Sequence, residues 1–473
     1  MATAYKTPGV YIEEIPKLPP SVAQVETAIP AFVGYTERSG LPGNPLPVTV
    51  VDISGTDTPI TNAFRISSLL EYETYFGKGP NEAITVDVEE DYDASGVLTR
   101  RQISAAIGTP NIHTMYYHMQ MYFANGGGPC YIVSVGDTTE TAISDENLIA
   151  GLNNVRNYDE PTLLVVPQLN FVSLATDAGS IYTTAIQQAA DLKDRFAIFD
   201  CFNNSPSDLR GQVGINNLKY AAAYHPFLKT SLPVLYSAAS LTINYDRTDD
   251  GTPAPTANPI FTSLSTELQN LIKLEVDKLS PILPPSSSVA GVYAAVDNSR
   301  GVWKAPANVS LARVSGPTIN INELDQASLN VDVTAGKSIN VIRSFTGRGT
   351  LVWGARTLAG NDNEWRYVPV RRFYNMVEES VKKSTGVFVF EPNDANTWVK
   401  VQGMIENYLT TLWRDGALQG AKPEHAFYVA VGLNKTMTAL DILEGRMIVE
   451  IGMAVVRPAE FIILRFSHLM AQS

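Results

Sequence analysis

The sequence predicts a multidomain protein of mixed α/β and α+β class, and three observations support this prediction. The chain has 473 residues, more than one hydrophobic core usually holds, so two to four domains are expected. Over residues 101–280, apolar strand patterns alternate with amphipathic helix patterns, as in a largely parallel sheet covered by helices. Over residues 343–390 the pattern reads strand, turn, strand, helix, strand, which is typical of an α+β core.

The charge balance argues against nucleic acid as a partner. The chain carries a formal net charge of −13 at pH 7, whereas an electrostatic grip on nucleic acid needs clustered Lys and Arg to displace counterions. An acidic exterior instead helps to keep a large assembly soluble.

Cysteine content and hydrophobicity bear on where the chain is made. Cys130 and Cys201 lie in apolar strand-like runs, where buried free thiols are common, and two cysteines build no disulfide framework. Residues 1–20 hold no apolar core of signal-peptide length, and no apolar run approaches the ~18 residues of a membrane span. We expect synthesis in the cytoplasm and no direct insertion into a membrane.

The N-terminal part, residues 1–38, begins with a short strand pattern. Val10, Tyr11 and Ile12 present apolar surface there, and a lone strand needs partners for its backbone groups. Prolines between residues 16 and 20 stiffen the chain that follows, which favours pairing at a distance. The alternative is an edge strand of the chain's own domain.

Residues 39–100 are rich in Gly, Pro, Thr and Asp around short β-favouring pieces, which predicts a small β-rich insertion that faces outward. The acidic run Glu89-Glu90-Asp91 is more typical of a solvated edge than of a metal site.

Residues 101–285 read as a middle α/β domain, with helices between strands at CYIVSV, TLLVVP, FAIFDCF and PVLYSAA. The glycines at 126–128 follow a helix and open a strand, the reverse of a phosphate-binding loop. His113 and His118 are five apart and do not share a helix face as a metal-binding pair would. Asp200 is either a metal or ribose contact or a loop-ordering or capping residue, and the lack of a second carboxylate or a basic partner nearby in sequence favours the latter. We expect no catalytic residue, cofactor or metal ion.

Residues 286–473 follow a boundary rich in Pro and Ser and form a C-terminal α+β core. A hairpin is predicted from Leu351–Trp353 and Trp365–Val370, followed by a helix that Gly386 ends and a strand at VFVF. A second helix over residues 397–414 and strands at HAFYVAVGL and RMIVEIGMAVV complete this core.

The last apolar run, FIILRF, predicts a terminal strand with an apolar face that needs covering. A free, flat, apolar strand invites pairing with the edge of another sheet. The alternative is an ordinary last strand of the same sheet. The apolar residues concerned are Phe461, Ile462, Ile463, Leu464 and Phe466.

Several long words of this sequence resemble those of one protein family. GRGTLVWGARTL and EWRYVPVRRFYNMVEES resemble the C-terminal core of contractile tail sheath proteins, which build phage tails and related injection particles. TPGVYIEEI and IPAFVGYT resemble the opening of these proteins, and VAGVYAAVDNSRGVWKAPAN resembles the segment that leads back into their core. The resemblance implies that residues 1–38 hold an arm and the first segment of the core domain.

The resemblance also implies roles for both ends of the chain. In sheath proteins the N-terminal arm reaches a neighbouring subunit, and a tail similar to PAEFIIL lies in the sheet of a neighbour. This implies that Val10, Tyr11, Ile12 and the apolar residues of FIILRF form inter-subunit strand arms.

Arg371, Arg372, Lys382 and Lys383 form the densest basic feature of an acidic chain. A solvated helix face is the ordinary interpretation. In sheath proteins this core lies inside the sheath against the tube, so the resemblance implies that these four residues contact the tube.

The resemblance implies a non-enzymatic sheath subunit that polymerises with itself around an inner tube and contracts to drive the tube through a target envelope. Its partners would include the inner tube protein and the baseplate and tail-terminating proteins, in a virion tail or a phage-tail-like particle. Two alternatives stay open: an α/β enzyme that uses residues 101–285, and a non-contractile structural surface protein.

Overall fold

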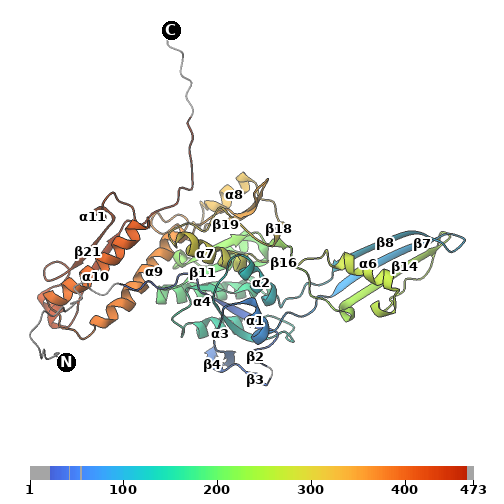
Figure 1. Cartoon of the computed structure of the whole chain (residues 1–473), viewed down its shortest axis with the longest axis horizontal. Helices are drawn as coiled ribbons and strands as arrows, with labels where there is room; N and C mark the ends of the chain where they lie inside the picture. The colour runs from blue at the N-terminus through green and yellow to red at the C-terminus, as the bar shows by residue number, and fades with distance from the viewer. Residues whose placement is uncertain (1–21, 42, 54–55, 466–473) are drawn as a thin grey trace, which may run out of the picture. The chain divides into compact units, whose positions relative to one another are not determined.

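The computed structural model describes residues 22–41, 43–53 and 56–465. Two compact units can be distinguished within this part of the chain (Figure 1). Unit 1 contains residues 22–25 and 377–456, and unit 2 contains residues 26–376 and 457–465. The chain therefore passes from one unit to the other after Val25, after Met376 and after Val456.

The largest sheet among the described residues belongs to unit 2 and has nine strands. Six neighbouring strands, from β9 to β19, run parallel, and the outer three are antiparallel to their neighbours. In spatial order the strands are β17 (Val309–Ser310), β20 (Gly349–Val352), β19 (Asn340–Phe345), β12 (Ala221–His225), β11 (Phe196–Asp200), β10 (Leu163–Val165), β1 (Pro30–Thr36), β9 (Cys130–Asp137) and β6 (Phe64–Ile66).

Helices cover both faces of this sheet, which explains why its central strands are continuous apolar runs rather than alternating ones. Along β1, Val33 and Phe32 point into different hydrophobic clusters. The cluster around Val33 is covered by α3 (Asp145–Val155), α4 (Ala175–Leu192) and α5 (Pro206–Gln212). The cluster around Phe32 is covered by α1 (Leu69–Phe76), α2 (Met115–Ala124) and α7 (Ser286–Arg300).

A second, four-stranded sheet has its own small core. It pairs β7 (Ile84–Tyr92) with β8 (Leu98–Ile107) and β14 (Leu241–Asp249), and β15 (Thr252–Pro253) extends it. Figure 1 shows α6 (Thr266–Val276) beside these strands. Val86, Val88 and Ile243 pack with Leu268 and Ile272 to close this core.

Short elements complete unit 2. They are the sheet of β16 (Ile282–Leu283), β13 (Leu228–Thr230) and β18 (Val314–Pro317), the hairpins β2 (Gly40–Leu41) with β3 (Asn44–Pro45) and β4 (Val48–Ile53) with β5 (Thr56–Thr61), and the helix α8 (Glu323–Asn330).

Unit 1 packs helices on a two-stranded sheet. The Asp394 side chain caps α10 (Ala395–Arg414) by accepting from the backbone N–H groups of Asn396 and Thr397, and Val401, Ile405 and Leu412 form part of its buried stripe. The other elements are the end of α9 (Val368–Thr385), α11 (Pro423–Ala426), α12 (Ala439–Leu443) and the antiparallel pair β21 (Phe427–Val431) and β22 (Val449–Met453). The predicted helix over residues 397–414 and the two strands after it are confirmed.

The predicted hairpin of Leu351–Trp353 with Trp365–Val370 is wrong. The β20 strand instead pairs with β19, and residues 353–367 form an irregular strap. From Val368 the chain is helical, because Pro369 suits the first turn of a helix and would remove a hydrogen bond from a sheet.

Two further predicted strands are absent from the described part of the chain, and the terminal one, predicted to pair with a neighbouring copy, is untested. VFVF forms a short 3₁₀ turn at Gly386–Phe388, and Phe390 has a left-handed backbone. PVLYSAA is irregular because the backbone of Leu235 bonds instead to Glu82 and to the Tyr117 hydroxyl, and β12 takes the fourth position in the sheet. Residues 461–465 of FIILRF have no strand partner within this single chain.

The structure draws the domain boundaries differently from the sequence. The nine-stranded sheet joins strands from the predicted N-terminal, middle and C-terminal segments. The four-stranded sheet joins residues 84–107 with residues 241–253 and so crosses the boundary expected near residue 100. Local periodicity reveals the elements but does not reveal which of them, far apart in sequence, share a sheet.

Candidate functional site at the roots of the terminal segments

The terminal residues predicted as arms are only partly described. Val10, Tyr11, Ile12 and Phe466 lie outside the described residues. Phe461, Ile462, Ile463 and Leu464 are 69%, 80%, 77% and 72% exposed. Four consecutive apolar side chains therefore stand in solvent, an arrangement that usually marks a surface awaiting a partner.

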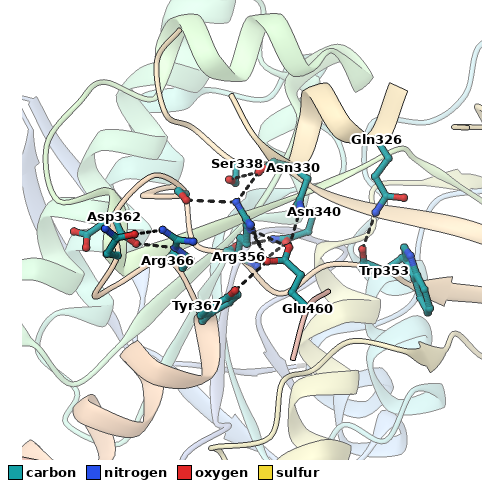
Figure 2. A network of polar contacts seen from close by, with 12 residues as sticks. Gln326, Asn330, Ser338, Asn340, Trp353, Arg356, Asp362, Arg366, Tyr367 and Glu460 are labelled. Carbon is teal, nitrogen blue, oxygen red and sulfur yellow. Dashed lines mark hydrogen bonds and ion pairs between the residues drawn. The ribbon is translucent and has the colours of Figure 1, made fainter. Parts of the chain in front are cut away.

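Glu460, immediately before these residues, is firmly held. Its Oε1 accepts from Arg356 Nε at 2.9 Å and from Asn330 Nδ2 at 2.8 Å. Its Oε2 accepts from Arg356 Nη2 at 2.7 Å and from the Tyr367 hydroxyl at 3.0 Å (Figure 2). We call Glu460 with Arg356, Asn330 and Tyr367 the C-terminal root.

The nine-stranded sheet fixes the position of Arg356. The Asn340 side chain, on β19, accepts from the Arg356 backbone N–H at 2.7 Å and donates to the Arg356 carbonyl at 2.8 Å. It also donates to the Ala223 carbonyl of β12 at 3.2 Å. The guanidinium is turned toward Glu460 because its Nη1 donates to the Asn330 carbonyl at 3.2 Å.

The electrostatics of the C-terminal root keep Glu460 ionised. Burial acts to raise the pKa of this carboxyl, but hydrogen bonds from Arg356 and Asn330 and the Arg356 charge outweigh it and hold the pKa below the ordinary value. The two side chains of the ion pair are only 4% and 21% exposed. Removing one partner of such a buried pair typically costs ~3–5 kcal/mol, because the other charge is left uncompensated.

A second arginine–carboxylate pair holds the chain just before β1. Arg372 Nη2 donates to Asp297 Oδ2 and to the Thr27 carbonyl at 2.5 and 2.8 Å, and the Thr27 hydroxyl donates to Asp297 Oδ2 at 2.6 Å. Arg372 and Asp297 are 3% and 4% exposed. We call Thr27, Asp297 and Arg372 the N-terminal root.

The predicted basic surface is therefore corrected. Arg372 belongs to the N-terminal root, and Arg371 is 2% exposed with its guanidinium 4.3 Å from the Trp365 ring. Neither presents charge to a partner, because α9 buries this part of its length in the core of unit 2. Lys382 and Lys383 are exposed, at 69% and 40%, and both form ion pairs with Glu379.

Sequence reasoning missed Arg356, Glu460 and Asp297. Arg356 and Glu460 lie in GARTL and PAEF, the words that carry the family resemblance, and each is the single charged residue of its word. A charge in such a setting is buried only when it is paired, so the two words together held a signal.

Among the described residues, the sheet of unit 1 has only two strands. β21 and β22 pair antiparallel from Phe427 opposite Met453 to Val431 opposite Val449. Beyond β22, Val455 bridges Leu418. Two-stranded sheets are marginal on their own and gain stability when a further strand is added.

Side chains at positions where a parallel sheet usually places an enzyme site have structural contacts instead. Asp200 accepts from the Ser286 backbone N–H and hydroxyl at 2.7 and 2.5 Å and so caps α7. Gln168 lies where the order of the parallel strands reverses, the usual ligand crevice of such sheets. Its fully buried side chain accepts from the Tyr35 N–H at 2.6 Å and donates to the Ile112 carbonyl. Among the described residues, no helix is long and apolar enough to cross a membrane.

Comparisons with known proteins agree with this architecture. The family model described as phage tail sheath C-terminal domain matches residues 360–468. The tail sheath protein of Vibrio phage KVP40 is 19% identical over 355 residues, covering 72% of this chain and 50% of that protein. The tail sheath protein of Burkholderia phage BcepMu is 29% identical over 142 residues, covering 29% of this chain and 30% of that protein. The chain thus spans half or less of these curated relatives.

Solved structures match along the whole chain. A chain in the six-fold symmetrised baseplate structure of the anti-feeding prophage is 33% identical, with a TM-score of 0.62, over 99% of this chain and 100% of that chain. The sheath complex of the extracellular contractile injection system PVC, in the contracted state, is 32% identical, with a TM-score of 0.61 and 98% of both chains covered. The contracted helical sheath of the anti-feeding prophage is 32% identical, with a TM-score of 0.63, over 98% and 99%. The chain belongs to the contractile tail sheath family, whose members are structural proteins of phage tails and tail-like particles.

Proposed function

We propose that this protein is the sheath subunit of an extracellular contractile injection particle. Copies of the chain stack around an inner tube in an extended, metastable state and rearrange into a shorter, wider state that drives the tube through a target envelope. The observation that carries the proposal is the C-terminal root, where a held Glu460 is followed by four exposed apolar residues. The full-length likeness to sheaths of injection systems supports the type of particle.

The exposed residues 461–464 form an arm that pairs with the β21–β22 sheet of a neighbouring copy. An arm with about five net backbone hydrogen bonds contributes only a few kcal/mol, at ~0.5–1.5 kcal/mol each, plus apolar burial. One link is modest, but many links in one polymer act together as a mesh. Paired strands persist while the cores slide into new contacts, and a small free-energy difference per subunit adds up over the assembly.

The likeness to contractile sheaths and the exposed lysines at the end of α9 support three further contacts. The arm at Val10, Tyr11 and Ile12 is a second link between copies. Lys382 and Lys383, which keep exposed ammonium groups at the end of α9, contact the inner tube. The baseplate and a tail-terminating protein bind the two ends of the polymer. The subunit is made in the cytoplasm.

Deletion of residues 461–473 tests the proposal. The cut leaves Glu460 in place, so we expect a folded subunit with unchanged circular dichroism that builds no long sheaths when it is produced with the tube protein. Negative-stain electron microscopy measures the polymer length. Sheaths of normal length from the deleted chain would contradict the role of the arm.

A further inference from the structure

We propose that the Arg356–Glu460 pair is the positioning element of the C-terminal arm. It fixes the point at which the arm leaves its own subunit and thereby sets which backbone groups of the arm meet the neighbouring sheet. This inference rests on the proposed exchange of strands between subunits and adds the residues that control it.

The surroundings of the chain change abruptly at Glu460. Its side chain is 21% exposed and accepts five hydrogen bonds, two on Oε1 and three on Oε2, with Arg356 Nε shared between the two oxygens, so the acceptor capacity of the carboxylate is filled. The next residue, Phe461, is 69% exposed, and so are its successors to a similar degree. The boundary between held and free chain therefore falls at a single residue.

Arg356, which holds Glu460, is itself rigidly positioned. Arg356 is tied through Asn340 to β12 and β19, two parallel strands in the interior of the nine-stranded sheet. Close packing supports the strap, because a Cβ added at Gly360 would lie 1.7 Å from the Ser338 hydroxyl oxygen. That hydroxyl donates to the Asn330 carbonyl, which also accepts from Arg356. The arm therefore starts from the rigid core of unit 2.

The Arg356–Glu460 pair controls the length of the free segment. Release of Glu460 adds residues 458–460 to the free segment, about 10 Å of extended chain. One residue of slip along a strand is about 3.3 Å and turns every side chain to the opposite face of the sheet. Slack of this size is enough to lose a unique register with the neighbour.

The N-terminal root supplies an independent parallel. The Arg372–Asp297 pair holds the Thr27 carbonyl and hydroxyl immediately before β1. The segment before β1 and the segment after Glu460 are thus both fixed, where they meet the core of unit 2, by a buried guanidinium that is paired with a carboxylate. Glu460 is the better position for a test, because its carboxylate lies on the residue that directly precedes the arm.

The test separates positioning from fold stability. Glu460→Gln keeps the shape but places an amide –NH₂ against N–H and O–H donors, and Glu364→Gln on the same strap is the control with the same change in charge. Spin labels at Ile463→Cys and Val333→Cys, two positions that are 77% and 89% exposed, report the distance between arm and core. The two native cysteines are buried, so they do not compete for the label.

In the unassembled subunit, at a temperature well below the melting transition of the variant, we expect Glu460→Gln to widen the distribution of distances between the labels at least twofold while its circular dichroism matches that of the wild type. With the tube protein present we expect sheaths at least tenfold shorter, whereas Glu364→Gln behaves as the wild type. A narrow distribution in Glu460→Gln overturns the proposal, as do sheaths of normal length. Circular dichroism that differs from the wild type at that temperature also overturns it, because the pair would then serve the fold. The label experiment uses single subunits, so its outcome is independent of the deletion of residues 461–473.

Discussion

At the scale of single residues, the molecule uses buried charge to hold chain rather than to attract a partner. Arg356 and Arg372 are nearly inaccessible to solvent, and each guanidinium donates hydrogen bonds to a carboxylate and to a backbone carbonyl. A guanidinium suits this task because its planar set of N–H donors bonds several acceptors at once. The sequence favours a surface role for clustered arginines, and only the fold shows that α9 turns Arg371 and Arg372 inward.

Two buried titratable residues, Asp200 and His118, make the stability of the fold depend on pH. Burial raises the pKa of Asp200 to about 7, and burial lowers the pKa of His118 to about 3. Between about pH 4 and 6.5 the native state retains the Asp200 proton that the unfolded chain has lost, so this group lowers stability as pH rises. In the same range the native state excludes the proton that unfolded His118 binds, so this group raises stability as pH rises. The two contributions oppose one another.

Asp200→Asn removes the first contribution and leaves the second. We expect the stability of this variant to rise more steeply with pH than that of the wild type between pH 4 and 6.5, by up to ~1.4 kcal/mol per pH unit. Urea unfolding at a series of pH values measures the slope, with Glu364→Gln as an exposed control. Parallel curves for the variant and the wild type would show that Asp200 is not protonated in the native state.

At the scale of elements, strong hydrophobic periodicity was enough to predict a helix or strand from the sequence, and β propensity alone was not. The sequence predicted α10 and β21 because a long apolar stripe and a clean alternation leave few alternatives. It failed for residues 353–370, where aromatic and β-branched residues favour a strand, because these side chains pack around a strap and a helix instead. The charges in GARTL and PAEF indicated a buried pair, but the full C-terminal root could not be predicted, since its members come from positions 330, 356, 367 and 460 and meet only when the sheet assembles.

The cap of α10 gives a prediction at this scale. Asp394 accepts from two backbone N–H groups at 3.0 Å, so Asp394→Ala should lower the stability of unit 1 by ~0.5–2 kcal/mol. Asp394→Ser restores an acceptor and should recover most of the loss. Hydrogen exchange of the amides in α10 measures the effect. Equal protection in the alanine variant would mean that the cap contributes nothing.

At the scale of the whole molecule, the described part of the chain contains both parts that the proposed exchange of strands needs. The nine-stranded sheet supplies a stiff body, and the β21–β22 pair supplies a short sheet that a further strand can extend. Composition and alternation predicted the mixed class, and the resemblance predicted the family. Neither revealed that strands from residues 30–36, 130–225 and 309–352 form one sheet, since that depends on contacts between distant segments.

The most direct test of the central claim is a cryo-EM structure of the assembled sheath at a resolution that traces the backbone. We predict that residues 461–465 of each copy form a strand hydrogen-bonded to the β21–β22 sheet of another copy, with Glu460 still on Arg356. A map in which this segment folds back onto its own subunit, with no backbone of another copy beside it, would contradict the exchange of strands between subunits.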